Sequence, residues 1–423
     1  MLTFKQFLLF TEGNKNTHLE HVEDELINHG AKGVERAFEL FTLLLDTLGG
    51  HTDSPINITT KWDGAPAIFA GTDPSDGKFF VGTKGVFAKE PKMNKRITDI
   101  DKNHKDVRRG ESLQDKSSLR KKLKIAFRAL KDIGIDGYVV QGDMLYTKDS
   151  IKHVTIDGKK HIAFKPNTIT YTVPEDSDIA KQMLQTDMGI VFHTLYTGGP
   201  TIRDMQASFG FDANKLIKSN KVWFDDANFK DVSGQVNLTV SEQESIREAM
   251  RQARNHYWQV KEVFEFLDNT EQLSTLKMDL KAHINSSIKT HQAFEPDAVQ
   301  FAESFITKFI NKTTKDIEKL KTERGQIRKT KAMQAAVEYL NTNRTNIEMM
   351  YDMYLKLVDI KMVFVGKLSN LRAMDSFLEQ PDGSFVVTKP EGFVAVDHVG
   401  GAVKLVDRLE FSAANFDPNK KFG

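Results

Sequence analysis

One lysine stands alone in a stretch of small and apolar residues, ITTKWDGAPAIFAG, at positions 58–71. This residue, Lys61, is followed by Asp63 and Gly64 in the pattern Lys-x-Asp-Gly. Removal from water favours the neutral form of a lysine, and a neutral amine is a nucleophile. A nearby carboxylate can orient that amine or a bound ribose, and glycine allows close backbone approach. Taken alone, the pattern allows a nucleophilic lysine but does not require one, and a lysine that only ends a strand has the same features.

Five further segments place residues that can bind phosphate, base or metal on or beside short apolar strands. Lysine and arginine bind phosphate oxygens, carboxylates are ligands for Mg²⁺, and an aromatic ring can stack on a base. Each residue taken singly has an ordinary role in a core or a turn, so only their combination indicates function. The segments are VGTKGVF with Lys84, YVVQGDML with Asp143, GIVFHTLY with Phe192, PEGFVAVD with Glu391, and AVKLVDRLEF with Lys404 and Arg408.

In order along the chain, the six segments resemble motifs I, Ia, III, IIIa, IV and V of the covalent nucleotidyltransferase superfamily. That superfamily contains ATP-dependent DNA and RNA ligases and mRNA capping enzymes. The resemblance covers residues 57–198 and 383–411 but not the segment between them. It implies an enzyme, a phage-type polynucleotide ligase most similar to RNA ligases, that uses ATP and Mg²⁺. In this chemistry Lys61 attacks the α-phosphate of ATP, pyrophosphate leaves and a lysyl-AMP intermediate forms.

The resemblance also implies a role for each matched residue. Lys61 and Asp63 are the expected catalytic residues, and Asp143 and Glu391 are the expected ligands of Mg²⁺. Phe192 matches the aromatic residue that packs on the purine ring, and the basic residues match those that hold phosphate oxygens. The expected nucleotide-binding residues are Gly64, Lys84, Phe192, Glu391, Lys404 and Arg408.

The chain departs from the family pattern at three places. Asp143 stands where motif III usually has a glutamate, and Pro66 stands where many DNA ligases have an arginine. Motif V usually has a second basic residue two positions after the first. Here that position is Val406, so Arg408 is expected to substitute for it. Between motifs III and IIIa, the segment FKPNTITY contributes two polar residues that could face the same cleft, Lys165 and Asn167.

The spacing of apolar residues divides the chain into strand-rich and helical parts. Long amphipathic runs fill residues 240–370, whereas short strand patterns separated by Gly, Pro and Asp lie on both sides of them. We therefore expect an α+β fold, in which an antiparallel, β-rich nucleotidyltransferase domain carries a large inserted helical domain. The expected parts are a leader with helices at 1–56, the first part of the nucleotidyltransferase domain at 57–212, the helical insertion at 213–378, and the second part with motifs IV and V at 379–423.

Two capping boxes mark expected helix starts. The first, Thr17-x-x-Glu20, precedes two helical runs that are separated near Gly30. The second, Ser241-x-x-Glu244, opens a helix that is expected to run to about Leu267.

Composition narrows the class and location of the protein. The chain has 423 residues, a net charge of +1 and no cysteine, which excludes disulfide scaffolds, zinc ribbons and thiol catalysis. No apolar run approaches the roughly 20 residues of a membrane span, so no membrane partner is expected. The opening MLTFKQFLLFTEG lacks a basic secretory n-region, but it is similar to the leader of proteins packaged in T-even-like phage heads. We expect a cytoplasmic protein, in the host cell if phage-encoded, with the virion head as the alternative.

The expected partner is nucleic acid, RNA or DNA ends. RNA end-joining is favoured, because the twelve residues after Phe411 leave no room for the OB-fold that usually follows motif V in DNA ligases and capping enzymes. A DNA ligase, a GTP-using capping-type enzyme and a non-catalytic nucleic-acid-binding or virion protein with a degenerate ligase fold remain as alternatives. Basic helical residues suit phosphate contacts, although a solvated helix face would have the same composition; they are Lys312, Lys315, Lys319, Lys321, Arg324, Arg328, Lys329 and Lys331.

Overall fold

The computed structural model has a mixed α and β fold whose strands pair antiparallel, apart from one parallel pair formed by β10 (Met188–Thr197) and β12 (Val222–Asp226). The α+β architecture with antiparallel sheets agrees with the prediction. The structure describes residues 20–49, 57–109, 112–156, 158–227, 238–268, 273–290, 292–369, 375–379, 385–387, 392–396 and 402–409.

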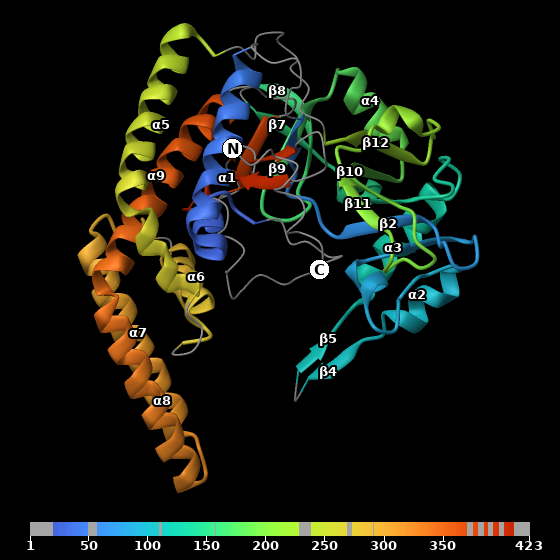
Figure 1. Cartoon of the computed structure of the whole chain (residues 1–423). Coiled ribbons are helices and arrows are strands. Elements are labelled where there is room, and N and C mark those ends of the chain that lie inside the picture. Colours follow the sequence, from blue (N-terminus) through green and yellow to red (C-terminus); the bar gives the residue numbers. More distant parts are fainter. Residues whose placement is uncertain are drawn as a thin grey trace.

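The helical part packs around one apolar core that includes the N-terminal helix α1 (Asp24–Leu48). In Figure 1, α1 lies alongside the later helices, and Phe41 of α1 stacks on Phe364 of α9 with ring centroids 5.8 Å apart. Residues 24–48, which were expected to lie outside the helical insertion, thus share its core. The later helices are α5 (Val240–Val260), η6 (Lys261–Asp268), α6 (Leu276–Lys289), α7 (Ala298–Glu318), α8 (Glu323–Thr342) and α9 (Arg344–Ser369).

The helix boundaries test the two predicted capping boxes. Helix α1 is interrupted at Gly30, whose φ of 57° favours glycine, so the expected break is confirmed. Thr17 lies outside the described residues. The second capping box is formed by Thr239 and Glu242, two positions before the predicted pair, and the Thr239 N–H donates to Glu242 Oε2 at 2.7 Å. The prediction chose the wrong one of two overlapping patterns, because both satisfy the same spacing.

A six-stranded sheet forms the centre of the β-rich part, with the strand order β11-β10-β6-β2-β3 and β12 beside β10. Helices α2 (Ile97–Asn103) and α3 (Ser117–Leu130) cover one face, where their apolar side chains share a core with the sheet. The opposite face carries two separate apolar clusters with polar residues between them. The other strands are β2 (Ala67–Thr72), β3 (Phe79–Gly82), β6 (Val139–Thr147) and β11 (Gln206–Phe209).

Two further sheets contain strands from both sides of the helical segment. In the first, β13 (Asp375–Glu379) pairs with β9 (Thr170–Pro174). In the second, β15 (Gly392–Val396) lies between β1 (Asn57–Lys61) and β16 (Ala402–Leu405). The chain therefore returns to the β-rich part after the helices. The remaining elements are β4 (Val107–Arg109), β5 (Ser112–Gln114), β7 (Lys152–Ile156), β8 (Lys159–Phe164), β14 (Phe385–Val387), α4 (Asp178–Gln185), η3 (Lys84–Phe87), η4 (Lys148–Ser150) and η5 (Ala213–Lys215).

Candidate functional site

Lys61 is the last residue of β1 and lies directly opposite Gly392, the first residue of β15. Residues opposite one another in neighbouring strands project from the same face of a sheet. Glu391 immediately precedes Gly392 in the chain but lies outside the described residues. The pairing brings the Lys-x-Asp-Gly segment next to the strand that follows Glu391.

Lys404 projects from the same face of the three-stranded sheet as Lys61. Val394 of β15 lies opposite both Lys404 of β16 and Thr59 of β1. Thr59 and Lys61 are two residues apart on one strand, and side chains two apart share a face. Two lysines that are 343 positions apart in the sequence therefore face the same side.

The helical core covers the other face of this three-stranded sheet. Lys61 and Lys404 therefore face away from the helical core. The alternate positions of the three strands are apolar, and they are buried in the core that contains α1, α5 and α9. Period-2 alternation then directs the polar set to the opposite side. The buried residues are Ile58, Phe393, Ala395, Val403 and Leu405.

Asp63 holds the loop that precedes β9. One carboxylate oxygen accepts a hydrogen bond from Asn167 Nδ2 at 2.5 Å, and the other accepts from the N–H groups of Thr168 at 2.6 Å and Ile169 at 2.7 Å. The Asp63 N–H donates to the Tyr171 hydroxyl at 2.8 Å. Asn167, singled out in the sequence, is thus brought to Asp63. These contacts make Asp63 a residue that positions the backbone around Lys61.

Gly64 allows the backbone after Lys61 to lie against β6. A β-carbon added at Gly64 would lie 2.5 Å from the β-carbon of Asp143, a separation that real side chains do not adopt. Beside it, the Ala65 N–H donates to the Met144 carbonyl at 2.9 Å. The glycine is therefore needed for the close approach that puts Lys61 near Asp143.

Asp143 and His193 are neighbouring polar residues on the six-stranded sheet, and both side chains are largely buried. His193 Nε2 lies 3.7 Å from Asp143 Oδ2, and the two side chains are 25% and 23% exposed. His193 is the extra residue of a β-bulge, because Phe192 lies opposite Gly142 and Thr194 lies opposite Gln141. Bulges redirect side chains and are frequent beside active sites.

The charge states of this pair follow from burial and from Lys61. Burial raises the pKa of Asp143 to about 7, the positive charge of Lys61 opposes the rise, and the negative charge of Asp63 adds to it. Burial, aided by Lys61, lowers the pKa of His193 to about 4. His193 is therefore neutral at pH 7. Because Lys61 acts on both groups, the three side chains share one electrostatic environment.

His193 and His21 are site residues that the sequence analysis missed. His193 had no signal in the sequence, because the bulge that places it beside Asp143 depends on pairing with β6. His21 lies beside Lys404 across a parallel bridge, and burial together with nearby Arg408, Lys404 and Lys61 lowers the pKa of His21 well below its usual value. No local pattern indicated that a residue just before α1 reaches this face.

Phe192 does not have the role expected for it. Its side chain is fully buried beneath the sheet, with ring centroids 5.8 Å from Phe211 and 6.3 Å from Phe224. A base could reach this ring only if the core opened. Phe192 shares this buried face with Met188 and Ile190, four and two positions before it, as the alternation of a strand requires.

Arg408 also differs from its expected role. Its guanidinium is buried and donates to Asp24 Oδ1 at 2.9 Å, to the Tyr354 hydroxyl at 2.7 Å and to Asn285 Oδ1 at 2.5 Å. It therefore joins the end of the β-rich part to α1, α6 and α9, and does not face the cleft. Val406, at the expected basic position, is buried instead.

Lys84 is exposed at the first position of η3, which directly follows β3. Phe87 of the same turn packs on Phe69 and Tyr196, with ring centroids 5.3 Å and 5.5 Å away. This cluster lies on the sheet face that carries Asp143. Lys84 is thus on the same side of the sheet as Asp143, at the edge of the site.

The acidic residues of the site suit a hard cation only in part. Within the described ranges, no group of three or more His, Asp or Glu side chains could hold a metal ion. Asp143 offers a carboxylate that is partly exposed to solvent. Magnesium commonly needs only one or two protein carboxylates, with water and phosphate oxygens as its other ligands. Asp143 therefore fits such a site, with Glu391 as the expected second ligand.

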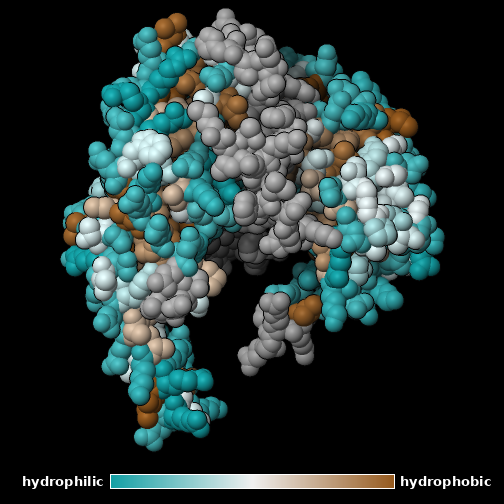
Figure 2. All heavy atoms as spheres, in the orientation of Figure 1, coloured by the Kyte–Doolittle hydropathy of each residue, from teal (hydrophilic) through white to brown (hydrophobic). Residues whose placement is uncertain are grey.

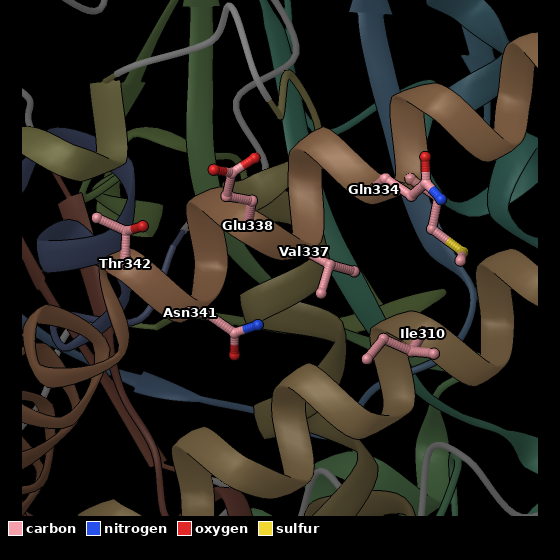
Figure 3. A pocket seen from close by; sticks show the side chains of 7 residues that line it. Ile310, Gln334, Val337, Glu338, Asn341 and Thr342 are labelled. Atoms are coloured by element: carbon pink, nitrogen blue, oxygen red, sulfur yellow. The ribbon is translucent and has the colours of Figure 1, made fainter.

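An open groove of about 610 Å³ lies away from these residues, between α7 and α8. Ile310 and Val337 point toward each other across it, and Glu338 and Asn341 line its edge (Figure 3). It does not belong to the site around Lys61.

The chain belongs to a protein family of unknown function, DUF6267, whose model matches residues 16–420. The match spans both the β-rich and the helical parts. No curated protein and no solved structure matches the chain. Across the described residues, no helix is long and apolar enough to cross a membrane.

Proposed function

We propose that the protein is an ATP-dependent polynucleotide ligase that joins RNA ends through a lysyl-AMP intermediate on Lys61. The observation that carries the proposal is the position of Lys61 at the end of β1, opposite Gly392, with Lys404 on the same face and Asp143 close by. Segments that are far apart in the sequence supply these residues. Their convergence supports a shared chemical role.

The first step is a transfer of AMP to the lysine. Nζ of Lys61 attacks the α-phosphorus of ATP, a P–N bond forms, the bond from the α-phosphorus to the bridging oxygen breaks, and pyrophosphate leaves. The amine loses a proton to solvent. Lys404 suits the phosphate oxygens, because an ammonium on the same face stabilises their charge.

Two further steps complete the joining of ends. A terminal 5′-phosphate attacks the lysyl-AMP phosphorus, which breaks the P–N bond and forms an adenylylated end. A 3′-hydroxyl then attacks the 5′-phosphate, forms the phosphodiester bond and releases AMP. Asp63 holds the loop beside Lys61 throughout, so it is a positioning residue.

Mg²⁺ is the metal that we expect, held by Asp143 and Glu391 or by water molecules bound to them. It would neutralise negative charge on the triphosphate. The Asp143 carboxyl is partly exposed, so it is accessible to such a cation or to a water molecule bound to it.

Labelling with α-³²P-ATP tests the proposal. Wild-type protein incubated with Mg²⁺ should retain label on a denaturing gel, and Lys61→Ala should not. Lys218→Ala, which changes an exposed lysine, is the matched control and should label normally. A Lys61→Ala protein that still takes label would exclude this nucleophile. Labelled protein supplied with RNA ends or nicked DNA then shows which is joined, and labelling by GTP would favour a capping-type enzyme.

A second candidate is a non-catalytic nucleic-acid-binding or virion protein with a degenerate ligase fold. Two observations favour it: Phe192 and Arg408 are buried in other roles. On this hypothesis no covalent nucleotide forms on the wild-type protein. We place the protein in the cytoplasm, or in the virion head if it is packaged; mass spectrometry of purified virions would distinguish the two.

A further inference from the structure

Helices α7 and α8 form a long hairpin that projects from the rest of the molecule (Figure 1). Between residues 308 and 331 the hairpin has nine lysines and arginines but only three acidic residues. It thus has an excess of six positive charges in a chain whose total charge is +1. The surface of the hairpin is mainly hydrophilic (Figure 2). Charge is therefore concentrated on this projecting element, here called the basic arm (residues 308–331).

The α7 side of the basic arm contains a regular row of lysines. Their spacing of four, three and four residues puts them on one face of the helix. The row is partly paired: Lys308 Nζ donates to Ser286 Oγ at 2.7 Å, and Lys312 Nζ lies 2.8 Å from Asp279 Oδ1 of α6. Toward the tip, Lys319 lies 3.3 Å from Asp316 on its own helix. The fourth member of the row, Lys315, is exposed.

The α8 side contains a second row, formed by Arg324, Arg328 and Lys331. Their spacing of four and three residues again selects one helix face. All three side chains are exposed, and none has a hydrogen bond or ion pair with any residue that the structure describes. Like charges at this spacing repel one another and destabilise a helix. An external anion would remove that repulsion.

The residue types of the basic arm favour a base-paired partner over a single strand. Proteins that hold single strands combine basic residues with aromatic rings on which bases stack. The only aromatic residue between positions 308 and 331 is Phe309, which is buried in the helical core. The arm therefore offers charge without a stacking surface. Charge of this kind matches the phosphates of a duplex, which are regularly spaced and outward-facing.

We propose that the α8 row of the basic arm binds the phosphate backbone of duplex nucleic acid. At about 1.5 Å of rise per residue, its three charges span roughly 10 Å, enough to contact about three phosphates along a groove edge. The proposal rests on the proposed function for its biological setting: the duplex is the base-paired part of the substrate whose ends are joined. Contacts to phosphate position a substrate without reading its sequence.

Salt-dependent binding tests this proposal. A fluorescein-labelled 24-base-pair duplex is titrated with the full-length protein at a series of KCl concentrations. The variant Arg324→Gln/Arg328→Gln/Lys331→Gln should reduce the slope of log K against log[KCl] by about 3, since the slope falls by about 1 for each phosphate-binding side chain that is removed. Lys131→Gln/Lys215→Gln/Lys218→Gln removes the same charge from exposed sites of the β-rich part, and it should keep the wild-type slope.

Two further measurements separate the effect of charge from that of helix structure, and nucleic acid from an acidic protein. Arg324→Lys/Arg328→Lys keeps the charges and should keep the slope, whereas a reduced slope would mean that helix structure, not charge, had been measured. Polyglutamate of equal charge should compete poorly; equal competition would overturn the assignment to a duplex in favour of an acidic protein. Absence of duplex binding at 50 mM KCl, or an unchanged slope in the triple glutamine variant, would also overturn it.

Failure of this inference is distinct from failure of the proposed function. Lys61→Ala should keep the wild-type salt slope and lose the label from ATP. The triple glutamine variant of α8 should keep the label and show the reduced slope. A wild-type protein that never labels but binds duplex through the α8 row would overturn only the proposed enzyme.

Discussion

Gly64 and Asp143 are in such close contact that a single methyl group would not fit between them. A β-carbon at Gly64 would lie 2.5 Å from Asp143 Cβ and 3.1 Å from the Met144 carbonyl oxygen. The loop that follows Lys61 therefore lies directly on the strand that carries Asp143. This contact makes the geometry of the site sensitive to changes far smaller than the removal of Lys61.

Gly64→Ala should separate the loop from β6. We expect a loss of about 1–3 kcal/mol in the free energy of unfolding, because backbone and a short side chain must shift together. We also expect labelling by ATP to fall at least tenfold in the protein that remains folded. Gly366→Ala is the control: nothing lies within 4 Å of a β-carbon there, and it sits within α9, where alanine is the better helix former. Normal labelling by Gly64→Ala would contradict the contact.

Asp143→Asn should change how stability depends on pH. Burial raises the pKa of Asp143 to about 7 in the folded protein, from about 4 when unfolded. Between these values the folded state binds more protons, so wild-type stability falls as pH rises. An asparagine does not titrate. Relative to wild type, the variant should therefore gain about 1–3 kcal/mol between pH 4.5 and pH 8, measured by urea unfolding. The exposed Asp132→Asn serves as control, and a gain independent of pH would refute the assignment.

Asp63→Ala should release the loop before β9. The change removes the acceptor for Asn167 and for the N–H groups of Thr168 and Ile169. We expect a loss of about 2–4 kcal/mol in stability, since hydrogen bonds to a charged group are strong and the Ile169 N–H that loses its acceptor is buried. Hydrogen exchange at Thr168 and Ile169 should quicken. Asn167→Ala keeps both backbone bonds and should cost less; an equal cost would indicate that the amide contact dominates.

Lys361→Met should show the cost of removing the nearest partner of a buried charge, since Glu23 Oε1 then keeps only the more distant Arg408 Nη1, 3.5 Å away, among its ion pairs within the described residues. Lys361 Nζ lies 2.7 Å from Glu23 Oε1, and both side chains are fully buried. Removing only the lysine should cost about 3–5 kcal/mol in the free energy of unfolding. The double variant Glu23→Gln/Lys361→Met should recover much of this loss, because no charge is then stranded. Arg251→Gln, at an exposed ion pair, should leave stability close to wild type. A double variant no better than the single one would argue against the pair.

Local patterns in the sequence predicted much of the fold. Helices α5 to α9 fill the range 240–370 in which long amphipathic runs predicted helices, because amphipathic spacing is a local property. The capping box of α5 was misplaced by two residues. The kink of α1 at Gly30 was also readable. The sequence did not predict that α1 joins the core of the later helices, since an apolar stripe on a helix does not specify the element against which it packs.

Residue types and local spacing were enough to identify the groups that could do chemistry: a lysine before Asp-Gly, an acid on a strand, and a lysine near the C-terminal end. Which of these groups meet depended on the folded chain. The register of β1, β15 and β16 put Lys61 and Lys404 on one face, while the β-bulge after Phe192 placed His193 3.7 Å from Asp143. Arg408 instead donates hydrogen bonds within a buried network that includes Asp24. The physical reason is that strand pairing, bulges and burial depend on residues distant in the chain, whereas residue type and local spacing do not.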